Sequence, residues 1–418
     1  MAGLTVFSIL IIAVMVTGRE YDDTRDAEID ELLKKLNKPA LKSIKSPDGD
    51  IIDCVHMKNH PIYDNPLFKK HTIQMRPSSY PKGWNKEASK NQNHSMVMHL
   101  WTINGKCPKN SIPIIRTRRE NILQAESVER YGRKDSNSLP QPKPTNPPSN
   151  TTNEYAIVTV NSPQGKFHGA QADINVWKPH VQTRREFSLA QIWVMGGTYP
   201  SRDTIEAGWQ ADEYKKTGCY DLRCPGFVHV NRDFAIGAPM PQQFPSWDPR
   251  TGNWWLRLGY YQILGYWPSS LFSNLKNGAS EIHWGGEITN YKEDSQHTST
   301  NMGSGRFAYE GYKKASYFMN LEIEEDGFTK PPESLTPFVT NQNCYNVIRN
   351  PFHPQLGASF YYGGPGQNAI EMRVNSGFFG SLDLRSGRVV RFPSFWSHSE
   401  LSQEGVVVGG RLLGLDFG

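Results

Sequence analysis

The sequence predicts an all-β fold, an antiparallel β-sandwich preceded by a smaller region of mixed α+β structure. The first supporting observation is composition, because 36 Gly, 29 Pro and many Trp, Tyr and Phe residues are typical of turns joining short aromatic-rich strands. The second is the period-two alternation of apolar and polar residues over 170–177 and 315–324, which indicates strands with one buried face. The third is that no helix-period stretch separates these strands, which argues against βαβ units and favours a sandwich.

The N-terminus predicts a secreted protein. Leu4–Val16 is a single apolar run that is too short to span a bilayer comfortably. Small residues at its end suit signal peptidase, and a charged stretch follows from Arg19. We therefore expect residues 1–18 to be a signal peptide and the mature chain to be extracellular, without stable membrane insertion.

Composition divides the rest of the chain into four parts. The first is 19–134, in which a helix is expected over 24–37, because apolar residues recur at helical spacing and acidic residues precede basic ones. Residues 135–152 are rich in Pro, Asn and Ser, cannot bury a core and are expected to be a solvated linker. The strand-rich region covers 153–366. The C-terminal tail, 367–418, carries no functional indication of its own.

Charge and motif content exclude several classes of function. The net charge is only +5 and basic residues occur in isolated pairs, so we expect no nucleic-acid partner. The sequence contains no GxSxG, HExxH or Walker motif. A dinucleotide-type match at Gly303–Ala308 has no helix pattern after it, and the histidines are scattered. We therefore expect neither a metal nor a cofactor.

The cysteines and two asparagines also fit a secreted chain. The five cysteines are Cys54, Cys107, Cys219, Cys224 and Cys344. Disulfides are expected in an oxidising compartment, although an odd count leaves at least one thiol without an internal partner. Cys219 and Cys224 are close enough in sequence to close one loop. Asn93 and Asn150 match the glycosylation acceptor pattern.

Two glutamates stand out because of the residues that share their strand faces. Glu206 lies in TIEAGWQ and Glu287 in EIHWGGEI, and each has a glycine, Gly208 or Gly285, two residues away on its own face. A missing side chain at such a position lets a substrate backbone approach the sheet. The other polar residues on these two faces are Thr204, Gln210, Glu281 and His283.

Two carboxyl groups that face each other would share a proton, because both cannot stay ionised cheaply at short range. One can then act as a base on water while the other, protonated, polarises the bond to be cleaved. The same pair on an aromatic-lined face also suits a glycoside hydrolase. A glutamate on the exposed face of a strand is, however, most often simply solvated.

The motifs around these residues resemble the plant neprosin family. In the order found in that family, the chain carries TIEAGWQ, TGCYDLRCPGF, GNWWL, GYWPSSLF, WGGE, HTSTNMGSG, KASY and FYYGGPG. Further upstream in this chain, the segments GDIIDCV, HTIQMRPSS and CPKNSIPIIRT are similar to the activation-peptide region of that family. The resemblance extends over residues 28–366.

The resemblance implies a secreted zymogen in which residues 19–134 are an activation peptide and 153–366 a catalytic sandwich of two antiparallel sheets. It implies a glutamic endopeptidase that is active in acid and cleaves after proline, so its partners would be proline-containing polypeptides. The family's catalytic glutamates correspond to Glu206 and Glu287, and one of its disulfides to Cys219 and Cys224.

Two departures from the family pattern lead to an alternative expectation. Only Ala211–Lys216 join the GWQ and TGCY motifs, which is shorter than in the family and predicts the loss of a strand beside Glu206, with an exposed sheet edge. The tail lacks the family's final cysteine, which leaves Cys344 without its partner. The alternative to an active peptidase is therefore a catalytically impaired binding module with the same fold.

Overall fold

The computed structural model describes the sandwich and the region before it, with gaps. The described residues are 25–80, 99–123, 127–128, 131, 151–162, 167–183, 185–198, 201–211, 222, 225–237, 242–247, 250–258, 262–291, 296–367 and 411–412. The predicted signal peptide, Asn93, Asn150, Cys219 and Cys224 lie outside them, as do most of the linker and the tail. Within the described residues, no helix is long and apolar enough to cross a membrane.

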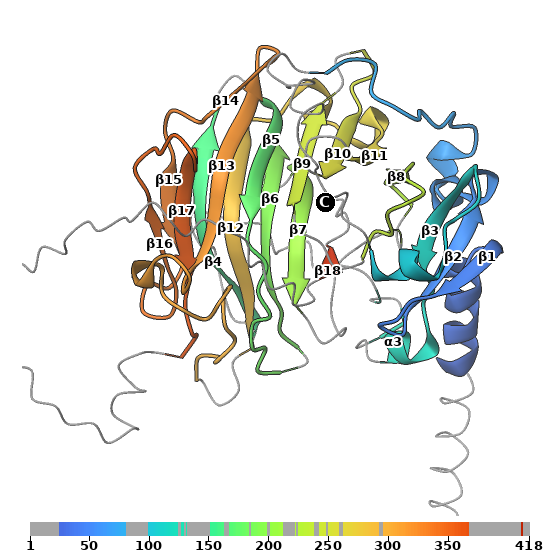
Figure 1. The fold of residues 1–418 in the computed structure, drawn as a ribbon, viewed down its shortest axis with the longest axis horizontal. Coiled ribbons are helices and arrows are strands. Elements are labelled where there is room, and N and C mark those ends of the chain that lie inside the picture. Colours follow the sequence, from blue (N-terminus) through green and yellow to red (C-terminus); the bar gives the residue numbers. More distant parts are fainter. Residues whose placement is uncertain are drawn as a thin grey trace, which may run out of the picture.

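The region before the sandwich has mixed α+β structure, as predicted (Figure 1). Residues 25–36 are helical, which confirms the predicted helix. A three-stranded antiparallel sheet follows, in the order β1-β2-β3. The elements are β1 (Ala40–Lys45), β2 (Ile51–His56), β3 (Ser111–Ile115), the 3-10 helices η1 (Met57–Asn59), η2 (Pro61–Asp64), η3 (Pro66–Phe68) and η4 (Leu100–Asn104), and α3 (Arg119–Leu123).

A disulfide fixes this region internally. Cys54 of β2 is bonded to Cys107, 53 residues further along the chain, with an S–S distance of 2.03 Å, and both residues are buried. Among the described cysteines, Cys344 is free and buried. The region before the sandwich therefore has its own covalent link, and its buried residues Ile44, Ile52, Cys54, Trp101 and Cys107 form an apolar cluster that also includes Ala235 of the sandwich.

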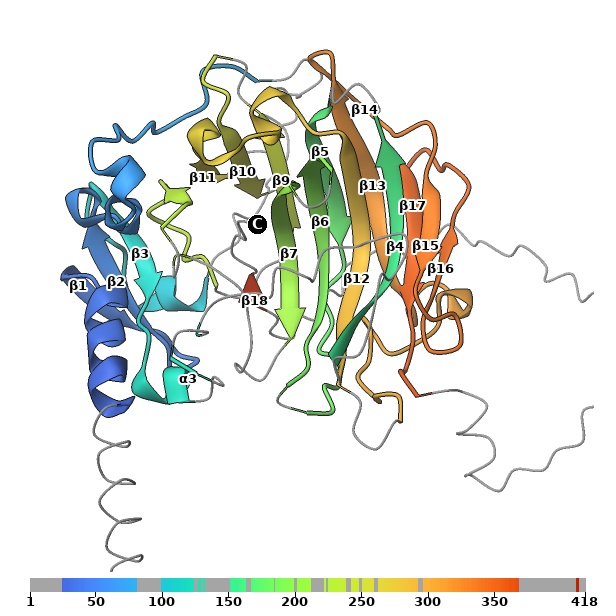
Figure 2. The same cartoon turned by 180° about the vertical axis from the view of Figure 1, so that it is seen from behind.

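The sandwich consists of two antiparallel sheets, which confirms the predicted fold class (Figures 1 and 2). One sheet has the order β16-β17-β13-β5-β9-β10-β11-β8, with β14 paired to β13. Its strands are β5 (Phe167–Ile174), β8 (Val228–His229), β9 (Gln242–Trp247), β10 (Trp254–Leu258), β11 (Gln262–Trp267), β13 (Ser316–Glu325), β14 (Phe328–Lys330), β16 (Asn346–Arg349) and β17 (Ala358–Gly363). The two alternating segments of the sequence correspond to β5 and β13, which pair with each other.

The second sheet carries both candidate glutamates and has the order β15-β4-β12-β6-β7-β18. Its strands are β4 (Thr151–Asn161), β6 (Ser188–Gly196), β7 (Asp203–Ala211), β12 (Glu281–Tyr291), β15 (Thr336–Val339) and β18 (Arg411–Leu412). β4 begins at Thr151, inside the range expected for the linker. Three short 3-10 helices complete the described elements: η5 (Ser269–Leu271), η6 (Leu275–Asn277) and η7 (Ala308–Glu310).

The apolar core lies between the two sheets. Alternate residues of β6, such as Ala190, Ile192 and Val194, point into it, because successive side chains of a strand face opposite sides. From the other sheet it receives large buried side chains such as Trp254 and Phe318. The remaining β6 residues, including Gln191, therefore face away from the core, on the side where the glutamates lie.

The edge strand β7 is paired at Trp209 and Gln210, near its end, where the sequence predicts an exposed edge. β18, from the C-terminal tail, pairs with β7 in antiparallel register, with Arg411 opposite Gln210 and Leu412 opposite Trp209. Pairing satisfies backbone groups that an edge strand would otherwise leave open. The tail therefore contributes a short strand that pairs with the part of β7 that follows Glu206.

Candidate active site

Glu206 and Glu287 lie on the same face of the same sheet, on the two strands that flank β6. Glu206 of β7 is opposite Trp193 of β6, and Glu287 of β12 is opposite Leu189 of β6. Both β6 residues belong to the set that faces away from the core, and they are four positions apart. The two glutamates are therefore placed diagonally, with Gln191 of β6 between them.

The glycines near the glutamates have a role that the sequence did not show. Gly208 and Gly285 both lie directly opposite Gln191, one on each side. A Cβ atom on Gly208 would lie 2.1 Å from the carbonyl oxygen of Ala190, and one on Gly285 would lie 2.4 Å from that of Ala156. The expected role, room for a substrate backbone, is thus replaced by a steric one, because neighbouring strands approach too closely for any side chain.

Glu206 is held by an amide. Nε2 of Gln191 donates to Oε2 of Glu206 over 2.6 Å. Gln191 has no exposed surface, and Glu206 is 2% exposed. A short hydrogen bond between two buried side chains on adjacent strands fixes the direction of the carboxyl group.

Glu287 is held from the other neighbouring strand. Oε1 of Glu287 accepts hydrogen bonds from Nδ2 of Asn153 at 2.8 Å and from the hydroxyl of Tyr155 at 3.0 Å. Oδ1 of Asn153 in turn accepts from the hydroxyl of Thr289 at 3.2 Å, which sets the orientation of the amide. Two donors on one oxygen fix the direction of this carboxyl group.

Both carboxyl groups are buried, whereas the sequence predicts a solvated strand face. Glu287 has no exposed surface, and the cluster around it is apolar. Its members are Tyr155, Ile157, Phe187, Leu189, Trp193 and Met195, with Phe338 packed against them. A periodicity of two correctly assigns residues to faces, but it does not reveal that the second face is also covered.

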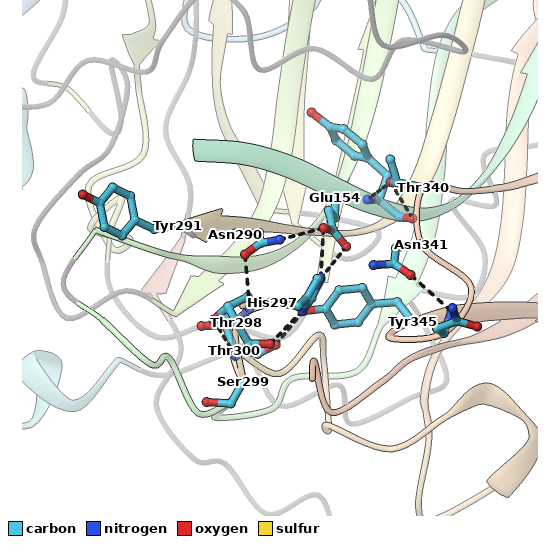
Figure 3. A network of polar contacts seen from close by, with 12 residues as sticks. Glu154, Asn290, Tyr291, His297, Thr298, Ser299, Thr300, Thr340, Asn341 and Tyr345 are labelled. Atoms are coloured by element: carbon cyan, nitrogen blue, oxygen red, sulfur yellow. Dashed lines mark hydrogen bonds and ion pairs between the residues drawn. The ribbon is translucent and has the colours of Figure 1, made fainter. Parts of the chain in front are cut away.

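A second polar network anchors the strands that hold Glu287 (Figure 3). Glu154 of β4 accepts from Nδ2 of Asn290 at 2.9 Å, and both its oxygens lie 2.9 Å from Nε2 of His297. Burial opposes a charge on His297, but hydrogen bonds to Cys344 and Glu154 outweigh burial and raise the pKa of His297 to about 10. The charged ring donates to Glu154 and, through Nδ1, to the carbonyl oxygen of Thr298 at 2.8 Å.

This network fixes the register of the site. Glu154 lies between Asn153 and Tyr155 in the chain, and Asn290 follows Glu287 by three residues on the partner strand. Linking Glu154 to Asn290 therefore secures β4 and β12 beside the hydrogen bonds that orient Glu287. Gln191, Asn153, Tyr155 and His297 were not identified from the sequence, because their partners are distant in the chain.

Comparison with known families identifies both parts of the chain. The sequence model described as Neprosin matches residues 184–365, and the one described as Neprosin activation peptide matches residues 43–159. Together they cover well over half of the sequence. The chain belongs to the neprosin family. The neprosin match includes Glu206, Glu287 and Gln191, and the activation-peptide match includes β2, β3 and the second half of β1. Membership of this family supports a peptidase.

Two solved structures are similar to this chain. One is a Scytalido-glutamic peptidase with a peptide based transition state analog, with 11% sequence identity and a TM-score of 0.29, covering 51% of this chain and 99% of that chain. The other is SCP-B, a member of the Eqolisin family of peptidases, in complex with a tripeptide. It has 12% identity and a TM-score of 0.29, and covers 50% of this chain and 96% of that chain.

Proposed function

We propose that this neprosin-family chain is the secreted zymogen of a glutamic endopeptidase that cleaves peptide bonds after proline in acid. The observation that carries the proposal is the placement of Glu206 and Glu287 on one sheet face, either side of Gln191, each held by side-chain hydrogen-bond donors. Such an arrangement provides two oriented carboxyl groups, the minimum that water-mediated hydrolysis requires.

Glu206 and Glu287 divide the acid and base roles between them. One carboxylate acts as the base that removes a proton from water as the water attacks the peptide carbonyl carbon, and the other carboxyl group acts as the acid that gives its proton to the carbonyl oxygen. When the resulting gem-diol collapses, one of its hydroxyl groups returns a proton to the acid, and the base passes the proton that it took from water to the leaving amine. The net result is addition of one water across the peptide bond, without a covalent enzyme intermediate.

The full chain is in a closed form, which supports latency. Glu206 is 2% exposed and Glu287 is not exposed at all, so a polypeptide cannot reach either carboxyl group in this form. Activation must therefore uncover the sheet face. The linker at 135–152 contains five prolines, and cleavage after proline would separate the activation peptide from the sandwich.

The test is cleavage of two peptides that differ only in Pro or Ala at one position, by the acidified, purified protein, with fragments identified by mass. The proteins compared are wild type, Glu206→Gln and Glu287→Gln. Glu322→Gln is the matched control, because Glu322 also lies on a strand and accepts from a glutamine, Gln171, but belongs to the other sheet.

We expect wild type and Glu322→Gln to cleave after proline, and Glu206→Gln and Glu287→Gln to release no fragment. Equal activity in Glu206→Gln or Glu287→Gln would overturn the assignment of these glutamates. A folded wild type that releases no fragment after linker cleavage would instead favour the impaired binding module.

A further inference from the structure

A segment of the activation-peptide region, residues 57–76, is docked on the end of the sandwich formed by β8 and β11. Its apolar side chains, including Ile62 and Phe68, form one buried cluster with Val228, Trp255 and Tyr266. Figures 1 and 2 show the N-terminal region beside β8 in both views. This docked segment therefore forms a shared core with the sandwich.

Polar contacts add to this docking. Nδ2 of Asn65 donates to the carbonyl oxygen of Pro225 at 3.0 Å. The hydroxyl of Tyr266 in β11 lies 2.7 Å from Nε2 of His71 and accepts from the backbone N–H of Gln74 at 3.0 Å. Separating the docked segment from the sandwich would break all of these contacts together.

His60 occupies the centre of this interface as a neutral ring. Its Nδ1 accepts a hydrogen bond of 2.9 Å from the backbone N–H of Ile62, which caps η2. Its Nε2 faces a hydrogen bond of 3.0 Å donated by the backbone N–H of His229 in β8, and lies 3.2 Å from the carbonyl oxygen of the same residue. Both ring nitrogens thus face a backbone N–H, so the neutral ring, which has one unprotonated nitrogen, can accept one of these two hydrogen bonds, whereas a charged ring can accept neither.

A second proton on His60 has no acceptor. A charged ring carries a proton on both nitrogens, so its Nδ1–H would point at the N–H of Ile62 and its Nε2–H would lie against the N–H of His229, which breaks the cap of η2 and places donors against each other. His60 is also 1% exposed, so the charge would be buried. The contacts and the burial of His60 therefore favour the neutral ring over the imidazolium.

The neighbouring titratable groups oppose the proton too. Burial, His229 and His71 lower the pKa of His60 to about 3, against a smaller opposing contribution from the backbone of His229. Burial likewise lowers the pKa of His229 to about 4 although its backbone acceptors favour the charge, and His99 lowers it further. Burial lowers the pKa of His99 to about 4, with Asp48 acting in the opposite direction.

We propose that His60 is an acid-sensitive latch, whose neutral ring holds the docked segment on β8 and whose protonation releases that segment from the sandwich. The proposal rests on the proposed function only in treating the released segment as part of an activation peptide. The docking itself is measurable in a chain that performs no catalysis.

The direction in which docking depends on pH follows from the pKa of His60 in the docked and released states. In the released segment the ring is solvated and has its ordinary pKa of 6.5, whereas in the docked state the pKa is about 3. Docking is therefore at full strength above pH 6.5 and weakens about tenfold for each pH unit below it, until the docked ring itself titrates. At pH 4.5 the contribution of His60 alone is a weakening of about 100-fold.

The test is hydrogen–deuterium exchange of the full chain at pH 7 and pH 4.5, corrected for the intrinsic pH dependence of exchange. Every protein carries Glu206→Gln and Glu287→Gln, so that self-cleavage does not contribute and a failed peptidase assignment leaves the measurement intact. His60→Asn is the test variant, because Asn stays neutral and retains an acceptor that can cap η2. His56→Asn is the matched control, since His56 caps η1 in the same way, through Nδ1 and the N–H of Lys58, without being buried.

Between pH 7 and pH 4.5, the protection of the docked segment against exchange is expected to decrease in all three proteins compared. The factor of this decrease should be about 100 times smaller in His60→Asn than in the parent, and the same in His56→Asn as in the parent. An equal fall in His60→Asn and the parent would overturn the proposal. If His60→Asn is unprotected already at pH 7, an NMR titration of the His60 ring in the parent decides. Titration of that ring near pH 6.5 while the segment stays protected contradicts the latch, and titration coincident with loss of protection supports it.

Discussion

Nε2 of Gln191 donates a hydrogen bond of 2.6 Å to Oε2 of Glu206, and both residues are buried. The two lie on neighbouring strands, β6 and β7, and Gln191 is also directly opposite Gly285 on the third strand, β12. Gln191 therefore fixes the direction of the Glu206 carboxyl group from the strand that separates β7 and β12.

Gln191→Leu keeps a similar side-chain volume but removes the donor to Glu206. We expect kcat for a proline-containing peptide to fall about 100-fold, with KM nearly unchanged, because an oriented donor acts mainly on the transition state. Gln171→Leu, which removes the corresponding contact to Glu322 in the other sheet, should leave both constants unchanged. An unaltered kcat in Gln191→Leu would mean that Glu206 does not depend on this hydrogen bond.

Tyr155→Phe removes one of the two donors to Glu287 but keeps the ring that packs edge to face against Trp193, at a centroid distance of 6.4 Å. We expect kcat to fall about tenfold and the free energy of unfolding to fall by about 1 kcal/mol, the usual net value of a hydrogen bond. The measurements are steady-state kinetics and urea unfolding. Tyr361→Phe is the control, because Tyr361 makes a similar edge contact with Tyr317 in the other sheet. A loss of stability without a loss of kcat would make Tyr155 a packing residue only.

Local periodicity was sufficient to predict the strands and the faces of the site. Alternation in TIEAGWQ and EIHWGGEI correctly grouped Glu206 with Gly208 and Glu287 with Gly285, because strand side chains alternate strictly. It could not show that this face is buried, since the apolar cluster there combines side chains of strands that are distant in sequence. It also could not distinguish glycine as space for substrate from glycine as space for the neighbouring backbone.

The residues that orient the glutamates were missed for a different reason. Asn153 is 134 residues from Glu287 in sequence and lies where the linker composition gives way to a strand. The Cys54–Cys107 disulfide similarly joins positions 53 residues apart. Such contacts depend on the order of strands in the sheet, which a single sequence pattern does not specify.

Gly208→Ala tests the steric interpretation of the glycines. A Cβ at position 208 would lie 2.1 Å from a backbone oxygen, so the strands must separate, and we expect a loss of about 3 kcal/mol in the free energy of unfolding. Gly327→Ala is the comparison, because Gly327 has φ +78° but no atom within 4 Å of its Cβ position. That variant should lose only about 1 kcal/mol, from backbone strain alone. Similar losses in urea unfolding of the two variants would contradict close strand contact at Gly208.

The contact between His297 and Glu154 predicts a loss of stability in alkali. The pKa of His297 is raised from 6.5 to about 10, so the charged ring contributes fully below pH 6.5 and its contribution is lost as the pH rises towards 10. We expect a decrease of about 2 kcal/mol in the free energy of unfolding between pH 6.5 and 9.5, less than the full shift implies, because solvent partly screens this pair. Urea unfolding of wild type and His297→Gln at both pH values measures it. The variant should lack this decrease, whereas His180→Gln, at an exposed histidine, should retain it. An equal alkaline loss in His297→Gln would show that another group titrates.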